Sequence, residues 1–256
     1  MQRVLIFIYG AAAFALFFAT FLYAIGFVGN LFVPKAIDSA PQVPFIQALL
    51  VNLGLLGLFA VQHSTMARPF FKRWLTRFIP SSAERSTFVL ASSLALITLF
   101  VFWQPMGGVV WSVANPHAQI LLHVAFTFGW LLVLFSTFLI NHFDLFGLRQ
   151  VWLNLHKQPY KELKFGTPVL YRLVRHPLYL GFILGFWATP VMTVAHLVFA
   201  LATTGYILIA IQLEERDLMN FHPEYADYRR RVPMIIPFIG RGKARKTLAT
   251  TTAKAA

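Results

Sequence analysis

The stretch YRLVRHPLYLG, residues 171–181, and the stretch EERDL, residues 214–218, decide how this chain folds. The segment between them is almost entirely apolar and contains Pro190. An apolar segment that enters a membrane and returns brings its two polar ends to the same membrane face. The sequence therefore predicts that Arg175, His176 and Tyr179 form one site with Glu214 and Glu215.

The Arg-His-Pro corner has the pattern of a helix start that binds an anion. Pro177 suits the first helical position, where its missing N–H is not needed, and this makes His176 the expected cap. The free N–H groups of Leu178, Tyr179 and Leu180 would then form a positively polarised cup for a carboxylate or phosphate. The alternative is that these polar residues only anchor a membrane helix at the lipid headgroups.

Composition indicates an integral membrane protein in the lipid bilayer. The 256 residues are 58% hydrophobic and only 12% charged, whereas soluble domains are roughly 25% charged. The net charge of +13 lies in short loops between apolar runs, where the positive-inside rule explains it without a nucleic-acid partner. Cysteine is absent, which excludes Cys-ligated zinc, iron–sulfur clusters and a cysteine nucleophile. No HExxH zinc motif occurs either, so we expect no metal.

Four apolar runs are long enough to cross the membrane. They cover residues 4–33, 45–61, 86–103 and 118–140. The loops 62–85 and 141–174 are basic, whereas the loop 104–116 contains no Lys or Arg. This alternation predicts that the amino terminus and both basic loops are cytoplasmic, in the inner membrane of a bacterium.

The fifth apolar region is predicted to be a hairpin. Residues 178–189 make about 18 Å of helix, too short for a hydrocarbon core of roughly 30 Å, and the basic region after residue 229 also belongs inside. We therefore expect an all-α, polytopic helix bundle with four full spans plus a C-terminal helical hairpin that turns at Pro190. Six full crossings are the alternative, so the bundle has five or six membrane helices. Gly181 and Gly185 form a GxxxG pattern that permits close helix packing. Residues 1–240 would be a single transmembrane domain, and 241–256 a basic, disordered tail.

Two further groups of polar residues lie at membrane edges. His142 and Asp144 follow the fourth span beside the predicted site, where they either face a substrate or contact headgroups. Glu214 and Glu215 end an apolar helix, which is costly unless they are hydrated or paired with a cation. That cation is either the neighbouring Arg216 or a bound cationic ligand. A helix amino terminus combined with Arg, His, Tyr and paired Glu suits a zwitterion.

These residues resemble a known family. The chain contains RHPLYLG at 175–181, EERDL at 214–218, and then Phe221, Tyr225, Tyr228, Val232-Pro233 and Pro237. This set is similar to the RHPxYxG…EExxL…F…Y..Y…VP pattern of integral-membrane methyltransferases related to isoprenylcysteine carboxyl methyltransferase. The front half, with Gln62-His63-Ser64 and residues 141–147, looks like the subgroup of methanethiol S-methyltransferases, which is akin to NnrU-like proteins.

The resemblance implies that S-adenosyl-L-methionine binds at the cytosolic ends of the last helices and that its methyl group passes to a small thiol, giving dimethyl sulfide from methanethiol. It implies cofactor contacts for a set of seven residues: Tyr171, Arg175, His176, Tyr179, Leu180, Glu214 and Glu215. A thiol needs help to ionise at neutral pH, and we expect His142 to take its proton, with Asp144 orienting His142. No obligatory protein partner is inferred.

Two alternatives stay open from the sequence. Methylation of an isoprenylcysteine carboxylate or of a lipid acceptor would keep the fold and the cofactor but require a lateral opening for a long chain. A haem-binding or transport protein would use histidines at similar membrane depth, and only His123 and His196 lie well inside apolar runs.

Overall fold

The chain folds as a bundle of membrane-spanning helices. The computed structural model describes residues 1–163 and 165–237, so the predicted tail at 241–256 lies outside the described residues. Within them, five helices are long and apolar enough to cross a membrane: α1 (Gln2–Gly29), α2 (Phe45–Ala67), α4 (Ser81–Phe102), α5 (Pro116–Ile140) and α9 (Val194–Phe221). The predicted all-α, polytopic architecture is confirmed.

The predicted hairpin is formed by a short and a long helix. The short arm is α8 (Pro177–Trp187), and the long arm is α9. The turn between them contains Pro190 and the strand β2 (Val191–Thr193). A pairing that the sequence did not predict joins β2 antiparallel to β1 (Val109–Ser112), so the loop before α5 fixes the turn of the hairpin.

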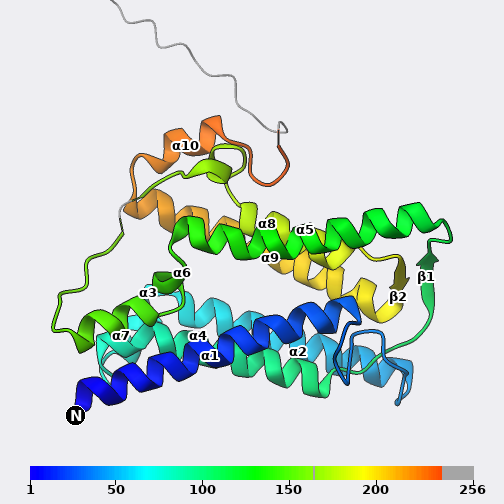
Figure 1. Cartoon of the computed structure of the whole chain (residues 1–256), viewed down its shortest axis with the longest axis horizontal. Helices are drawn as coiled ribbons and strands as arrows, with labels where there is room; N and C mark the ends of the chain where they lie inside the picture. The colour runs from blue at the N-terminus through cyan, green and yellow to red at the C-terminus, as the bar shows by residue number, and fades with distance from the viewer. Residues whose placement is uncertain (164, 238–256) are drawn as a thin grey trace, which may run out of the picture.

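The two ends of the bundle differ in character. Figure 1 shows the amino terminus, α3 (Pro69–Leu75), α6 (His142–Leu145), α7 (Leu148–Leu155) and α10 (Tyr225–Arg231) toward one end, and both strands at the other. The short helix η1 (Val169–Arg172) leads from α7 to α8. Both basic loops therefore lie at the end where α8 begins and α9 finishes.

The second span is longer than the apolar run predicts. We expected it to end at residue 61, but α2 continues to Ala67 and stops at Arg68, immediately before Pro69. The residue before a proline is driven out of the helical region, and Arg68 is extended with φ −76° and ψ 145°. Gln62, His63 and Ser64 are thus helical residues near the carboxyl-terminal end of α2.

Glycine allows α5 and α8 to touch through their backbones. A β-carbon added to Gly181 would lie 2.6 Å from the carbonyl oxygen of Gly129, and one added to Gly129 would lie 2.7 Å from the Gly185 nitrogen. The GxxxG pattern of α8 therefore serves close packing, as expected. This contact holds the short arm of the hairpin inside the bundle.

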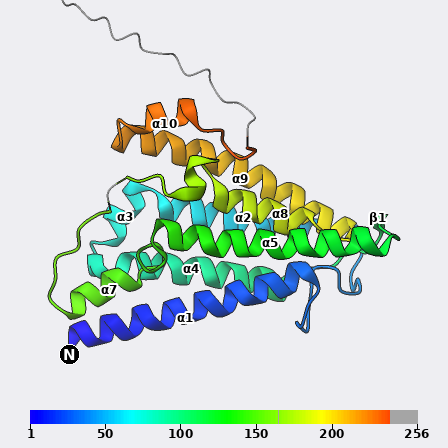
Figure 2. The same cartoon turned by 45° about the horizontal axis from the view of Figure 1, so that its top comes forward.

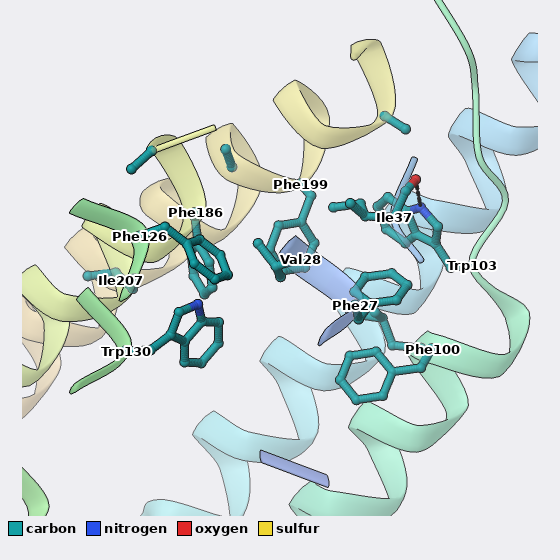
Figure 3. Packing of buried hydrophobic residues seen from close by; sticks show 14 of the residues in the cluster. Phe27, Val28, Ile37, Phe100, Trp103, Phe126, Trp130, Phe186, Phe199 and Ile207 are labelled. Carbon is teal, nitrogen blue, oxygen red and sulfur yellow. Dashed lines mark hydrogen bonds between the residues drawn. The ribbon is translucent and has the colours of Figure 1, made fainter. Parts of the chain in front are cut away.

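Aromatic side chains of α1, of α4 and of the residue after α4 pack against α9. Phe199 of α9 meets Phe27 at a centroid distance of 6.4 Å and Trp103 at 5.8 Å, both edge to face, and Phe27 in turn packs against Phe100 at 4.9 Å. Figure 3 shows this packing, including the hydrogen bond from Trp103 Nε1 to the Ile37 carbonyl at 3.2 Å. The loop after α1 is thereby fixed to the core.

A buried polar group, which we call the Asp38 clasp, joins that loop to the hairpin at the strand-bearing end. The Asp38 carboxylate accepts hydrogen bonds from Thr193 Oγ1 and from Asn30 Nδ2 at 2.7 Å, and it lies 3.3 Å from His196 Nδ1. His196 Nε2 is 2.9 Å from the Phe186 carbonyl. Both ring nitrogens of His196 thus lie beside oxygen acceptors, which hold the ring between the loop and α8.

Replacing Asp38 with Ala should destabilise the protein by about 3 kcal/mol, because it leaves the buried His196 ring without its anion. Asp227→Ala is the matched control, since that carboxylate is 63% exposed and pairs with Arg230 on the surface; a loss below about 0.5 kcal/mol is expected there. Equilibrium unfolding in detergent measures both.

The contribution of Asp38 should also depend on pH. Burial alone would raise the pKa of Asp38, but hydrogen bonds from His196 and Thr193 outweigh burial and hold it below its ordinary value of 3.8. A depressed carboxyl pKa gives stability that is present above the ordinary value and is lost as pH falls through the folded value. Equal stability of wild type and Asp38→Ala at neutral pH would contradict the clasp.

Candidate active site

The Arg-His-Pro corner is held by the segment that follows α10. Arg175 N–H donates to the Pro233 carbonyl at 2.9 Å, and His176 N–H donates to the Met234 carbonyl at 3.1 Å. Pro233 has no backbone N–H group, and this contact uses only its carbonyl. The Val-Pro motif and the Arg-His-Pro motif are therefore two sides of one backbone contact.

Glu215 lies at the centre of a buried ionic cluster. Its side chain is 2% exposed, and Oε1 accepts from Arg175 Nε at 2.6 Å and from His176 Nε2 at 3.0 Å. Arg229 Nε lies 2.9 Å from the other oxygen, Oε2. We call Arg175, His176, Glu215 and Arg229 the Glu215 cluster. The partners of Glu215 are these two arginines and this histidine, and not Arg216, which is exposed.

Arg175 makes two further contacts within the same cluster. Besides Glu215, its guanidinium donates to the carbonyls of Arg229 at 2.9 Å and of Val232 at 2.5 Å. Arg175 thus joins the start of α8, the end of α9 and the end of α10. This arrangement makes Arg175 and Glu215 a connection between helices, with few hydrogen-bonding positions left for a ligand.

Glu214 is in a different situation from its neighbour. It is partly exposed, and Oε2 accepts a hydrogen bond from the Tyr179 hydroxyl at 3.0 Å. Tyr171 lies in η1, where its carbonyl accepts from the Tyr228 hydroxyl at 2.5 Å. Burial, followed by the charge of Glu214, raises the pKa of Tyr171, so its hydroxyl keeps its proton beside Glu214.

Two buried polar atoms beside this cluster lack aligned hydrogen-bond partners among the described residues. They are Glu215 Oε2, with which the Arg229 N–H is not aligned, and the hydroxyl of Tyr225. Burial, and then Glu215, raises the pKa of Tyr225, which stays a donor. Unsatisfied buried groups are uncommon and often mark the position of a ligand. Acceptor and donor together fit a polar, zwitterionic molecule.

The amino terminus of α8 offers fewer free N–H groups than expected. Leu180 N–H donates to the His176 carbonyl at 3.1 Å, as in an ordinary helix. The prediction that Leu180 contributes a free N–H group to the anion-binding cup was therefore wrong. Leu178 and Tyr179 keep N–H groups without a protein acceptor in the described chain. His176 occupies the cap position, but its ring makes no cap hydrogen bond and turns to Glu215 instead.

His142 and Asp144 are not part of the Glu215 cluster. The His142 ring is 4% exposed, and Nδ1 lies 2.8 Å from Thr137 Oγ1. It stacks on Phe138 at 4.3 Å and meets Phe14, Phe143 and Phe146. All of these described contacts come from α1, α5, α6 and the residue after it. The ring therefore lies between α1, α5 and α6.

Asp144 makes its contacts away from His142. Its carboxylate pairs with Arg149 Nη1 at 2.7 Å and accepts from the Tyr160 hydroxyl at 3.3 Å. Thr137, and not Asp144, contacts the His142 ring nitrogen. Sequence spacing predicted an Asp–His pair, but the N–H of Asp144 is capped by Asn141 at 3.1 Å, which turns the carboxylate toward the following loop.

Several polar residues of α2 and α9 were missed as neighbours of the site. Arg68 pairs with Asp217 at 2.8 Å, and Ser64 Oγ lies 3.1 Å from the Tyr206 hydroxyl. Tyr206, Glu214 and Asp217 follow helical spacing along one face of α9. That spacing was visible in the sequence, but the partner of this face was not.

The histidines expected for a haem site lie apart. His196 belongs to the Asp38 clasp, whereas His123 is exposed on α5. Among residues 1–163 and 165–237, no group of three His, Cys, Asp or Glu could hold a metal ion. The haem-binding alternative therefore has no support from the structure.

Known proteins with similar sequences cover nearly the whole chain. A methanethiol S-methyltransferase of Crocosphaera subtropica is 56% identical over 242 residues, which is 94% of this chain and 95% of that protein. One of Mycobacterium tuberculosis is 54% identical over 239 residues, 93% of this chain and 98% of that protein. Nurim of Sus scrofa is 31% identical over 191 residues, 67% of this chain and 70% of that protein. The chain matches no protein-family model and no solved structure.

The two adjacent glutamates should respond differently to the same change. Glu215→Gln removes the anion from a buried cluster of cations, so the free energy of unfolding should fall by about 3 kcal/mol or more. Glu214→Gln is the matched control, because its carboxylate is partly exposed and has a single neutral donor; a loss below about 1 kcal/mol is expected. Equal losses in detergent unfolding experiments would refute the separation of roles.

Proposed function

This chain belongs to the methanethiol S-methyltransferase family, and we propose on that basis that it transfers a methyl group from S-adenosyl-L-methionine to methanethiol, giving dimethyl sulfide. The observation that supports the location of the reaction is the Glu215 cluster, which joins both family motifs at one end of the bundle. The partners are thus a small thiol and the lipid bilayer.

S-adenosyl-L-methionine supplies a methyl group on a positively charged sulfur, together with an ammonium, a carboxylate and ribose hydroxyls. The proposed cofactor-binding residues are the seven from the sequence: Tyr171, Arg175, His176, Tyr179, Leu180, Glu214 and Glu215. Their chemistry fits these groups, because the partly exposed Glu214 carboxylate, which has the Tyr179 hydroxyl as its hydrogen-bond donor, can also accept from an ammonium or a hydroxyl group. Free N–H groups at the start of α8 suit the carboxylate.

We assign different tasks to the members of that set. Glu214 has a partly exposed carboxylate and would bind an ammonium or hydroxyl group directly. Glu215, Arg175 and His176 are engaged with one another and would shape the site. Leu180 would act through its side chain, since its N–H is used within α8.

His142 has the hydrogen-bonding state that a base for the thiol proton requires. The Thr137 hydroxyl donates to the Leu134 carbonyl at 2.6 Å, so it accepts from His142 Nδ1. The proton therefore resides on Nδ1, and the lone pair of Nε2 is available. Burial lowers the pKa of His142, which keeps the ring neutral near pH 7. Asp144 would act only indirectly, by holding the loop after α6 through Arg149.

The protein's remaining contribution is alignment of the reactants and exclusion of water. Methyl transfer between sulfur atoms is an in-line displacement, so orientation supplies much of the rate acceleration. The phenylalanines around His142 make the immediate surroundings of its ring apolar. A neutral thiol can enter such a space, whereas bulk water is disfavoured there.

The location and extent of the enzyme are part of the proposal. Both basic loops lie at the end that carries the site (Figure 1), and the positive-inside rule puts that end in the cytoplasm of a bacterium, with both termini there. Residues 1–240 would act as one transmembrane domain. The reaction would then use cytosolic cofactor at the inner membrane face.

Acceptor choice tests the proposal directly. Purified protein given labelled S-adenosyl-L-methionine should convert methanethiol to dimethyl sulfide and leave a prenylcysteine unmethylated. Gas chromatography of the headspace and extraction of the lipid products measure the two reactions. Methylation of the prenylcysteine alone would establish the isoprenylcysteine alternative instead.

Replacing His142 with Ala should lower kcat for methanethiol by about a hundredfold or more, because general-base assistance is lost. Affinity for S-adenosylhomocysteine, measured by calorimetry, should change little. His156→Ala is the matched control, since this exposed histidine bonds only to the Trp152 carbonyl among the described residues. An unchanged kcat in His142→Ala would remove His142 from the mechanism.

A further inference from the structure

Arg85, in the first turns of α4, is an arginine without an anionic partner. Its Nε donates to the Leu145 carbonyl at 2.7 Å. Neither terminal nitrogen of its guanidinium has an acceptor among the described residues, and no carboxylate of that part of the chain lies within 4.0 Å. Two of the three guanidinium nitrogens are therefore available.

The other partly buried arginines show that this is unusual. Arg68 pairs with Asp217 at 2.8 Å, Arg149 with Asp144 at 2.7 Å, and Arg175 with Glu215 at 2.6 Å. Removing a cation from water is costly unless an anion accompanies it. Arg85 is the exception among the four partly buried arginines of the described chain. The carboxylates of Glu84 and Asp144 act on it only from beyond 4.0 Å, so its terminal nitrogens can still bind a small anion directly.

The surroundings of Arg85 contain further polar groups without partners. The Phe88 ring contacts both the Arg85 guanidinium, at 5.0 Å, and the His63 ring, at 4.9 Å. His63 Nδ1 lies 3.2 Å from Ser92 Oγ, and no described residue hydrogen-bonds its Nε2. Gln62 Oε1 is buried without a partner in the described ranges. An aromatic wall thus meets a cation, an imidazole and an unsatisfied amide oxygen.

This group is linked both to the helix of the proposed base and to the helix that carries Glu214 and Glu215. Leu145, which holds Arg85, belongs to the same four-residue helix as His142. On the other side, Ser64 follows His63 and contacts Tyr206 of α9. Tyr206 precedes Glu214 by eight residues, about 12 Å along the helix axis. Figure 1 shows α6 and α3, which follows α2, toward the same end of the bundle, and Figure 2 shows α3 at that end from a second side.

We propose that Arg85, with His63 beside it, binds the methyl acceptor as a small alkyl thiolate. This inference rests on the proposed function. A guanidinium near the sulfur favours the ionised form of the thiol and so lowers its pKa. The faces of Phe88 and Phe59, which stacks on His63 at 5.2 Å, suit the sulfur and the methyl group.

The step balances without any further reactant. The thiol proton passes to the lone pair of His142 Nε2, and the thiolate sulfur forms a bond to the transferred methyl carbon. The bond between that carbon and the donor sulfur breaks, and its electron pair stays on the donor sulfur, which becomes neutral. Arg85 neither gains nor loses a proton, and its charge is matched by the thiolate until the new bond forms.

An acidic acceptor tests the role of the charge. Methaneselenol is close to methanethiol in size but is already ionised near neutral pH, so it needs no help to lose its proton. In Arg85→Gln, kcat/KM for methanethiol should fall by about tenfold to hundredfold more than kcat/KM for methaneselenol. Arg85→Lys, which keeps the charge, should preserve the ratio of the two acceptors. Arg77→Gln, an exposed arginine of the preceding loop, is the matched control and should resemble wild type.

Binding of S-adenosylhomocysteine provides the second readout. Its affinity for Arg85→Gln should equal that for wild type, because the acceptor and not the cofactor contacts Arg85. A weakened affinity would assign Arg85 to the cofactor carboxylate and overturn the proposal. An equal loss for both acceptors would also overturn it, because it would mean that Arg85 acts only by holding α6.

Two further outcomes are distinguishable from these. A wild-type protein that methylates neither acceptor refutes the proposed function itself and this inference with it. If Arg85→Gln does not fold, Arg85→Met is used, since its apolar side chain can pack on Phe88 as the arginine stem does. The ratio of kcat/KM for methanethiol to kcat/KM for methaneselenol in that variant then decides for or against the proposal.

Discussion

The structure of the active end depends on neutralising one buried carboxylate. Glu215 is enclosed where the apolar helix α9 leaves the membrane region, and such a charge is tolerable only with cations around it. Arg175 and His176 come from the start of α8, and Arg229 comes from α10. One charge requirement therefore brings three separate segments together. Glu214, one residue earlier, is left free for other contacts.

The opposite end of the hairpin is fixed by a contact in which the carboxylate comes from a loop and the basic side chain comes from α9. There Asp38 comes from a loop and His196 from the start of α9. An ion pair at each end of α9 means that the long arm is held in register with the rest of the bundle, while its middle packs through aromatic rings such as Phe199. Side-chain packing alone tolerates sliding between helices better than two such pairs do.

The sequence predicted the hairpin and the meeting of its two motifs because both follow from local physics. Helix length, the proline at 190 and the placement of basic loops limit where an apolar chain can go. The cofactor roles proposed for residues such as Glu214 stay predictions. What could not be predicted was the choice of ion-pair partner. Glu215 pairs with the distant Arg175 and not with the adjacent Arg216, and Asp144 pairs with Arg149 and not with the nearer His142.

The spacing of polar residues along one helix also does not show which other helix that face contacts. Tyr206 and Asp217 were visible as members of one face of α9, but their partners Ser64 and Arg68 come from α2. The pairing of β1 with β2 was equally invisible, since neither strand is long enough to give an alternating pattern. Long-range contacts of this kind depend on the complete arrangement of the bundle.

The glycine contact between α5 and α8 has a consequence for the route by which molecules reach the interior. With Gly129 and Gly181 so close that a single added carbon would clash, this seam admits no hydrocarbon tail from the surrounding lipid. A ligand with a long hydrocarbon chain would have to enter between another pair of helices. A molecule as small as a volatile thiol needs no lateral opening between helices, so the contact between α5 and α8 can stay closed throughout the catalytic cycle.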